Sequence, residues 1–487
     1  MSYFLLPEIH NIIECINLTN SGPTSNTNTE PTNNTNTDPT SNTNTDPTNE
    51  PTSNTNTDPT NNTNTEPTSN TNTEPTSNTN SNENNVYVSK TLNVYLNNIK
   101  KHIDENIDTW DYNKKYTNPY EFIHTIVPNN KYSVSKLKPM SRSFYKMIEM
   151  TNLFYLFEDF KYENMKSFHL AEGPGGFIEA TSYMRKNVND IYYGMTLIDN
   201  DPNVPGWKKT KHFLDTNSNI CIECGATNTG DLLSVENLQY CYNKYHNSMN
   251  IITADGGFDF SVDFNKQEGM ASNLLIAQSS FAIAMQKIGG HFILKIFDIF
   301  TKTTCDILYL LCSLYKKVYI VKPNTSRLAN SEKYIVCKYF KGSHSNLIPN
   351  IINEYPKLLQ YNSISSIINS KLDYYFINRV EEINAIFGQQ QIENINTTLS
   401  LSNNTKNEKI ESLKKNNIQK SIHWCEKFNI PHNKNVLSTN IFMTNSITRK
   451  CYDNMDAVNT GAVTGAVTGA DGIDADTVDI RYSNMTP

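Results

Sequence analysis

The stretch HLAEGPGGFIEA (residues 169–180) decides how the middle of this 487-residue chain folds. An apolar run leads into Gly-Pro-Gly-Gly, and apolar residues at helical spacing follow. A strand, a glycine-rich turn and a helix in this order are typical of open α/β sheets, which bind ligands at the carboxyl ends of their strands. The turn has neither the G-x-G-x-x-G spacing of dinucleotide binders nor a following G-K-(S/T). A tight turn without a ligand therefore stays open as an alternative.

Strands and helices alternate around this turn. Seven apolar segments rich in β-branched residues have the length of strands: residues 167–173, 191–197, 219–225, 250–257, 291–297, 317–323 and 333–340. Helical patterns separate most of them, notably at residues 273–288 and 303–317. This alternation predicts an α/β fold with a mostly parallel sheet.

Composition divides the chain into six segments. The unit PT(S/N)NTNT(D/E) repeats through residues 23–84 without an apolar residue, so this tract cannot bury surface and is predicted to be disordered. The predicted organisation is an N-terminal segment (1–22), the repeat (23–84), an N-terminal helical extension (85–140), the α/β domain (141–344), a C-terminal helical region (345–432) and a low-complexity tail (433–487).

Charge and cysteine usage indicate the kind of partner and the cellular compartment. The chain carries a net charge of −7, but its ends are acidic and residues 85–451 sum to +8, which weakly favours a polyanionic partner. The nine cysteines lie among apolar neighbours, as reduced cysteines of intracellular proteins do. We find neither a signal peptide nor an apolar run long enough to cross a membrane. The sequence thus predicts an intracellular, cytoplasmic protein without a membrane partner.

A zinc site is the alternative interpretation of one cysteine pair. Cys221 and Cys224, followed by Cys241 and His246, could supply ligands. The segment around the pair also alternates like a strand, which would place Cys221 and Cys224 on opposite faces. We therefore expect a strand here and no metal.

Four separated motifs, taken together, resemble one family. HLAEGPGGF, TADGG, GGHFILKIF and KPNTSRLANSEKYIVCKYF occur in the order found in FtsJ/RrmJ-type S-adenosylmethionine-dependent RNA 2′-O-methyltransferases. The resemblance covers about residues 105–342 and is greatest to the Adrift-type cap methyltransferases and their relatives in large DNA viruses. It implies a Rossmann-like methyltransferase sheet of seven strands, six parallel and one antiparallel.

The resemblance also implies a catalytic tetrad. Matching motif by motif places it on Lys146, Asp255, Lys295 and Glu332. Lys295 is unusual on its own terms, because a charge inside the apolar strand HFILKIF needs a partner or a function. For Lys146 a solvated helix face is the alternative, and for Asp255 it is an ordinary turn aspartate.

The cofactor implied by the resemblance is S-adenosylmethionine. Its methionine and ribose part would lie on the glycine turn, and the residues expected to bind it are Glu172, Gly173, Pro174, Gly175, Gly176, Phe177, Thr196, Asp231 and Asp255. Thr196 stands where many members have a ribose-binding carboxylate, although Asp199 is close. Asp231 matches the acidic residue expected near the adenine amine.

These expectations combine into one predicted function and two alternatives. The first is methyl transfer to the ribose 2′-OH of RNA, at the cap-proximal nucleotides of mRNA, without a metal. The alternatives are a methyltransferase for rRNA or tRNA, and a non-catalytic RNA-binding subunit that keeps the fold. Asn-, Ile- and Lys-rich usage fits an AT-rich genome such as that of a large cytoplasmic DNA virus, so a viral factory or virion is a further possible setting.

Overall fold

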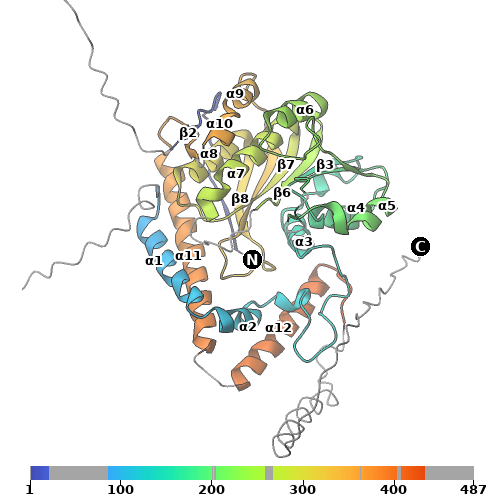
Figure 1. Ribbon diagram of the computed structural model, residues 1–487, viewed down its shortest axis with the longest axis vertical. Helices are drawn as coiled ribbons and strands as arrows, with labels where there is room; N and C mark the ends of the chain where they lie inside the picture. The colour runs from blue at the N-terminus through green and yellow to red at the C-terminus, as the bar shows by residue number, and fades with distance from the viewer. Residues whose placement is uncertain are drawn as a thin grey trace, which may run out of the picture.

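The computed structural model describes residues 2–11, 13–20, 86–199, 201, 204–257, 267–361, 364–402 and 407–433. The repeat tract and nearly all of the predicted C-terminal tail lie outside these residues. The described part consists of a large sheet covered by helices and of a group of helices beside it (Figure 1).

The seven predicted strands all form one sheet. They are β3 (Lys166–Leu170), β4 (Ile191–Met195), β5 (Ile220–Ile222), β6 (Met249–Ala254), β7 (Gln286–Ile296), β8 (Tyr315–Lys322) and β9 (Lys333–Phe340). Their spatial order is β8-β9-β7-β6-β3-β4-β5, and β9 runs antiparallel to both of its neighbours. The pairs from β7 through β5 are parallel. The predicted arrangement of six parallel strands and one antiparallel strand is therefore confirmed.

An eighth strand, which the sequence did not predict, extends this sheet. Strand β1 (Ser2–Leu5) pairs antiparallel with the outer edge of β8. The chain that follows buries Leu6 and Ile9 in the core, and β2 (Thr19–Asn20) pairs with β10 (Ile364–Ser366) in a separate two-stranded sheet. The N-terminal segment is thus part of the packed molecule.

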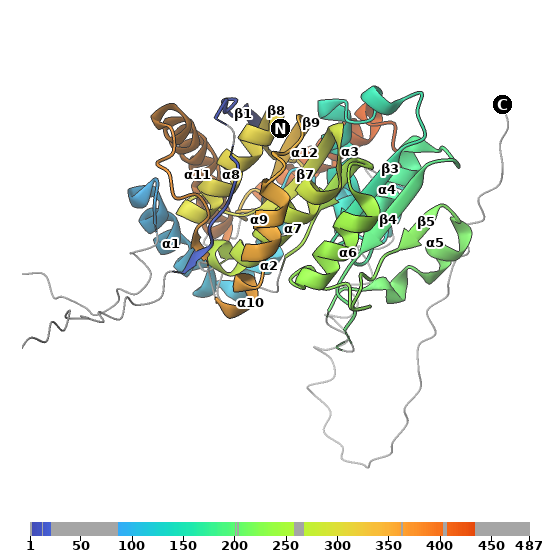
Figure 2. The same cartoon turned by 90° about the horizontal axis from the view of Figure 1, so that it is seen from above.

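The two faces of the sheet bury alternate side chains of each strand. Ile252 and Phe292 pack into the core under α6 (Val235–Tyr245), α7 (Gln267–Met285) and α8 (Lys302–Leu314). Ile251 and Ile293 point the other way, into the core under α3 (Ser143–Phe154) and α4 (Gly176–Arg185). Helices accordingly lie on both sides of the strands (Figure 2). Burial on both faces explains why these strands are nearly continuous apolar runs.

Helices from both flanks of the sheet domain pack on one another. We call α1 (Lys90–Asp104), α2 (Ile107–Thr117), α11 (Tyr374–Ser402) and α12 (Asn407–Lys427) the helical arch. It runs down the left side of the sheet domain and across below it in Figure 1. The hydroxyls of Thr117 and Thr398 are 2.7 Å apart, and Asn417 Nδ2 donates to the carbonyl oxygen of Tyr116 at 2.8 Å. Two segments far apart in sequence therefore form one unit.

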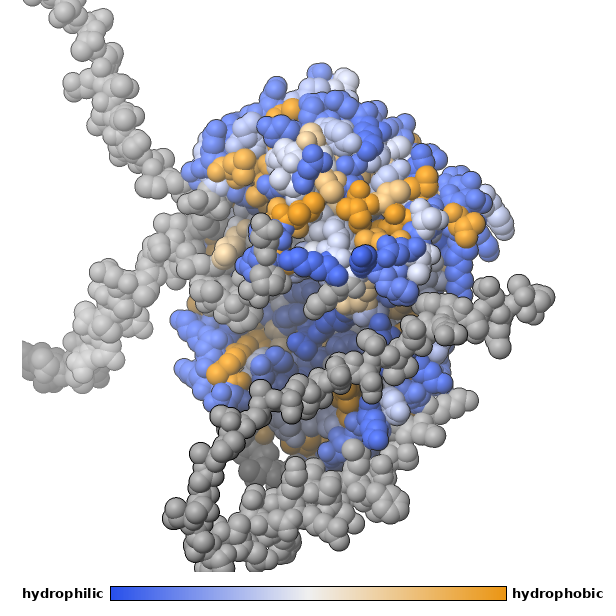
Figure 3. All heavy atoms as spheres, turned by 45° about the vertical axis from the view of Figure 1, so that its right-hand side comes forward, coloured by the Kyte–Doolittle hydropathy of each residue, from blue (hydrophilic) through white to orange (hydrophobic). Residues whose placement is uncertain are grey.

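The remaining short helices are α5 (Lys211–Thr216), α9 (Leu347–Glu354) and α10 (Lys357–Gln360). On the face seen in Figure 3, hydrophobic residues form a band across the upper part, while the lower part is mostly hydrophilic. Within the described residues, every helix falls short of the length and apolar content needed to cross a membrane.

Candidate active site

The glycine turn joins β3 to α4 and is held by a buried carboxylate. Glu172 Oε1 accepts hydrogen bonds from the backbone N–H groups of Phe177 and Ile178, both at 2.8 Å. These are N–H groups of the first turn of α4, which have no partner within the helix. Burial raises the pKa of Glu172 to about 8 against the opposing effect of these bonds. Glu172 therefore ties the glycine turn to the first turn of α4.

Two of the glycines face protein atoms. A Cβ on Gly173 would lie 2.6 Å from the carbonyl oxygen of Pro205. A Cβ on Gly176 would overlap the hydroxyls of Ser141 and Ser143. Gly175 has φ +113°, which lies in the left-handed region that favours glycine. Packing and backbone conformation thus require glycine here, whatever ligand the turn holds.

The other residues expected at the cofactor site lie around the same sheet edge. Phe177 is fully buried, and its backbone N–H is already bonded to Glu172. Thr196 follows β4 and is 6% exposed, and the loop at Gly230 packs on its carbonyl oxygen. Asp231 Oδ1 accepts from Leu233 N at 2.8 Å, and the exposed Asp199 accepts from Asp201 N at 2.9 Å. Backbone amides therefore already occupy one oxygen of each of these two aspartates.

The predicted tetrad comes together at the adjoining strand ends as two ion pairs. Lys146 Nζ, on α3, lies 2.7 Å from Glu332 Oε1. Lys295 Nζ, on β7, donates to the backbone carbonyl of Asp255 at 2.6 Å and lies 3.3 Å from the Asp255 Oδ1 atom. The side chains are mostly buried, with between 7% and 16% of their surface exposed. The structure thus brings all four residues together.

A fifth residue, Tyr334, joins the two pairs and was missed in the sequence. Its hydroxyl donates to Asp255 Oδ1 at 2.7 Å and accepts from Lys146 Nζ at 3.2 Å. Tyr334 is the cross-strand partner of Lys295 and follows Glu332 by two positions. Because side chains two apart in a strand share a face, this spacing could have identified it. Its pKa is raised well above 10 by burial and by the nearby Asp255 and Glu332 charges, so the phenol stays a donor.

Glu332 is the strongest electrostatic feature of the cluster. Burial opposes its ionisation, but the positive charges of Lys146 and Lys295 outweigh that effect and hold its pKa far below the usual range. Ser326 Oγ donates to Glu332 Oε1 at 2.8 Å and fixes the carboxylate further. The two lysines therefore favour the ionised form of Glu332.

Residues 139–340 match the model of the FtsJ-like methyltransferase family. This segment is therefore similar to FtsJ-like methyltransferases. It contains the glycine turn, the tetrad and all seven predicted strands. The family resemblance expected from the four motifs is therefore confirmed.

Curated proteins are also similar to part of this chain. A Bos taurus protein described as cap-specific mRNA (nucleoside-2′-O-)-methyltransferase 1 is 31% identical over 264 residues, which is 52% of this chain and 31% of that protein. A Danio rerio protein described as cap-specific mRNA (nucleoside-2′-O-)-methyltransferase 2 is 27% identical over 63% of this chain and 42% of its own length. This chain therefore spans less than half the length of these two relatives.

A solved structure also aligns with the chain. It is a ribosomal RNA methyltransferase from Plasmodium falciparum, with 22% sequence identity and a TM-score of 0.29. The alignment covers 42% of this chain and 98% of that one.

The loop that carries Glu332 is held against α3 by hydrogen bonds. Glu149, one turn after Lys146, is 1% exposed and accepts from the backbone N–H groups of Asn324 and Thr325 at 3.0 and 3.1 Å. Arg142, one turn before Lys146, donates to the carbonyl oxygen of Thr325 at 3.1 Å. One face of α3 therefore fixes the position of Lys146 and of the loop that carries its partner, Glu332.

The proposed zinc ligands do not form a cluster. Cys221 lies within β5, Cys224 follows that strand, and Cys241 is buried on α6. Over the described ranges, no group of three or more His, Cys, Asp or Glu side chains is placed to hold a metal ion.

Proposed function

We propose that the protein transfers a methyl group from S-adenosylmethionine to the ribose 2′-OH of RNA, at the cap-proximal nucleotides of mRNA. The observation that carries the proposal is the pair of lysines, Lys146 and Lys295, each held by a carboxylate at the sheet edge beside the glycine turn. The similarity to FtsJ-like methyltransferases supports the chemistry, and the descriptions of the bovine and zebrafish relatives support a capped substrate.

The donors and acceptors at the sheet edge fit this cofactor. Carboxylates follow neighbouring strands at Asp199, Asp231 and Asp255, and they suit a ribose diol, an adenine amine and a sulfonium cation. We assign binding to the glycine turn (residues 172–177) together with Thr196, Asp231 and Asp255. When bound, S-adenosylmethionine supplies a methyl group on a positively charged sulfur.

The side chains of this chain supply the remaining chemistry. A ribose hydroxyl is a poor nucleophile because its pKa lies far above neutrality, so it must be positioned and its developing negative charge must be stabilised. Lys295 Nζ, fixed by Asp255, is the group proposed to lie beside that oxygen. Lys146, fixed by Glu332, adds a second positive charge. The Tyr334 hydroxyl links the two ion pairs, because it bonds to Lys146 and to Asp255.

Radiolabelled methyl transfer tests the proposal. The full chain is incubated with methyl-labelled cofactor and capped mRNA, uncapped RNA of the same sequence, or ribosomal RNA. We expect label on capped RNA, in dinucleotides that resist alkaline hydrolysis because their 2′-OH is methylated. Labelling of ribosomal RNA alone would replace the cap assignment, and absence of label on every RNA would favour the non-catalytic alternative.

The cellular location of the protein is part of the same proposal. The eight described cysteines are free thiols, five of them buried. Together with the mRNA methyltransferase relatives, this usage supports an intracellular and cytoplasmic protein. The assignment to the Adrift-type branch and to a large DNA virus stays a prediction from motifs and composition.

A further inference from the structure

Two buried lysines outside the tetrad hold the backbone that carries Glu332. Lys322 ends β8 and Lys333 begins β9, and their exposed fractions are 7% and 4%. Lys322 Nζ donates to the carbonyl oxygens of Asn330 and Glu332 at 2.7 and 2.8 Å, and to Asn330 Oδ1 at 3.0 Å. Lys333 Nζ donates to the carbonyl oxygen of Ser331 at 2.8 Å. Three consecutive carbonyl oxygens, the last of them that of Glu332 itself, are therefore held by buried ammonium groups.

Loop stability alone is a poor reason to bury these charges. The three acceptors of Lys322 Nζ are neutral oxygens. Burial, reinforced by the positive charge of Lys333, lowers the pKa of Lys322 to about 7. Asp298 balances part of the charge, with its carboxylate oxygens 3.6 Å from Lys333 Nζ and 3.3 Å from Lys100 Nζ. Because a buried ammonium costs free energy that an apolar side chain of similar size does not, we expect Lys322 to do more than stabilise the loop.

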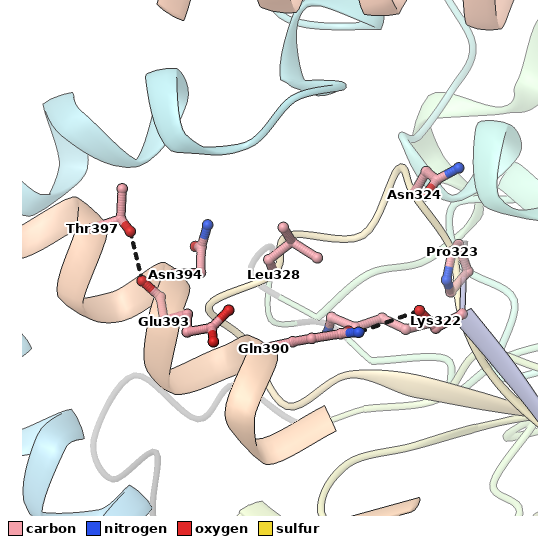
Figure 4. A pocket seen from close by; sticks show the side chains of 9 residues that line it. Lys322, Pro323, Asn324, Leu328, Gln390, Glu393, Asn394 and Thr397 are labelled. Carbon is pink, nitrogen blue, oxygen red and sulfur yellow. Dashed lines mark hydrogen bonds between the residues drawn. The ribbon is translucent and has the colours of Figure 1, made fainter. Parts of the chain in front are cut away.

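The position of Glu332 depends on the backbone that the two lysines hold. The Glu332 carboxylate lies 2.7 Å from Lys146 Nζ, and this pair sets the position of one of the two lysines of the tetrad. Displacement of a catalytic group by about 1 Å can lower the rate about 100-fold. Lys322 lies in the wall of a cavity of about 390 Å³, beside Pro323 and Asn324 at the start of the same loop (Figure 4). The loop therefore borders open space into which it can shift once the bonds of Lys322 are removed.

We propose that Lys322 and Lys333 are positioning residues for methyl transfer, an inference that rests on the proposed function. They fix the backbone that leads to Glu332, so that its carboxylate meets Lys146. Both lysines act through Glu332 and not on the reacting atoms, since backbone oxygens already bind their ammonium groups. The tetrad lysines carry out the chemistry, and this second pair holds one of their carboxylate partners in place.

The kinetics of Lys322→Met in the full chain test the inference. Methionine removes the three hydrogen bonds but keeps a side chain of similar length in the cavity wall. We expect kcat to fall about ten- to hundredfold while KM for S-adenosylmethionine changes less than about threefold, because Glu172 holds the glycine turn separately. The matched control is Lys338→Met. Lys338 is 8% exposed and donates to the carbonyl oxygen of Phe154 at 2.7 Å, toward the opposite end of α3 from Lys146. The control variant should have a lower melting temperature and an unchanged kcat.

Two kinetic outcomes would overturn the inference. One is a folded Lys322→Met protein with the kcat of the wild-type protein, and the other is an equal loss of kcat in Lys338→Met. If Lys322→Met does not fold, Lys322→Gln replaces it, since a neutral amide keeps N–H donors but its shorter chain cannot reach all three acceptors. A fall in kcat with unchanged KM then supports the inference in the same way, and an unchanged kcat overturns it.

A double-mutant cycle in urea unfolding separates the inference from the proposed function, because it needs no substrate. If Lys322 positions Glu332, Lys146→Met should destabilise the Lys322 variant less than it destabilises the wild-type protein. Direct repulsion between Lys322 and Lys146 alone would give the opposite sign. Lys146→Met and Lys338→Met should be additive. A wild-type protein that methylates no RNA but shows this coupling refutes the proposed function and leaves Lys322 as the residue that positions Glu332. An active protein without the coupling overturns the inference and leaves the function.

Discussion

The glycine turn and the lysine cluster lie at the same edge of the sheet but are built on opposite physical principles. Each contains a buried glutamate. Burial raises the pKa of Glu172 to about 8, and its carboxylate accepts bonds from backbone N–H groups of α4. At Glu332 burial acts the same way, yet Lys146 and Lys295 outweigh it and the pKa falls far below its usual range. The turn is organised by shape, whereas the cluster is organised by charge.

The largest expected effect belongs to the cluster. Lys295→Ala should lower methyl transfer by roughly two to four orders of magnitude, the usual contribution of a positioned proton-transfer or charge-stabilising group. Cofactor affinity should fall much less than turnover, because the glycine turn is held separately by Glu172 and Asp255 keeps its hydrogen bond from Tyr334. Single-turnover kinetics and cofactor calorimetry measure the two quantities.

Lys295→Met decides whether that lysine is there for chemistry or for structure. Methionine keeps the length of the side chain and removes its charge. If Lys295 serves only to pair with Asp255, the Met variant should keep its activity and lose stability, since removing one partner of a buried ion pair leaves the other charge unpaired. A folded Met variant with unimpaired turnover would therefore refute the role proposed for Lys295.

A pH-dependent effect is expected at the turn. The folded-state pKa of Glu172 is about 8 against a usual 4.5. The folded protein therefore holds a proton that the unfolded chain releases, and stability falls as pH rises from about 4.5 to about 8. The loss from this group is at most about 5 kcal/mol. Glu172→Gln keeps an oxygen for the Phe177 and Ile178 N–H groups, so its melting temperature should fall less between pH 5 and pH 8.

The control for this experiment is Glu158→Gln, because the Glu158 side chain is 64% exposed. Its melting curve should follow the wild-type protein across the same pH range. Parallel pH profiles for the wild-type protein and Glu172→Gln would show that Glu172 is ionised in the fold.

Shape at the turn predicts a smaller effect on stability. Gly176→Ala would push a methyl group into the Ser141 and Ser143 hydroxyls, and such overpacking costs typically about 1–3 kcal/mol. Gly269→Ala is the matched control, because a Cβ there meets nothing within 4 Å on helix α7. Urea unfolding should separate the two variants. If Gly176→Ala matches the control in stability and loses only cofactor affinity, the turn is shaped for the ligand and not by its packing.

The sequence predicted the sheet and the members of the cluster but not how the turn is packed. Apolar runs predict the sheet, whereas the resemblance to a known family assigns the tetrad of Lys146, Asp255, Lys295 and Glu332. Of these four residues, only Lys295 is unusual in its own local pattern. That Gly176 faces Ser141 and Ser143 depends on how α3 crosses α4, which no local pattern reports. For the same reason the sequence did not indicate that Ser2–Leu5 adds a strand beside β8, since that pairing joins residues more than 300 positions apart.

The smallest effect concerns the hydroxyl that joins the two ion pairs. Tyr334→Phe removes one oxygen, breaks the bonds to Asp255 Oδ1 and Lys146 Nζ, and leaves the ring packed near Phe177. Both charged partners keep their ion pairs, so the loss should be the net contribution of these two hydrogen bonds, roughly tenfold in turnover at about 0.5–1 kcal/mol each. Cofactor affinity should stay constant. If Tyr334 served only to support the fold, cofactor affinity would fall together with turnover. A loss as large as that of Lys295→Ala would mean that Tyr334 itself contacts the reacting oxygen, and the cluster would then depend on a neutral donor as much as on its charges.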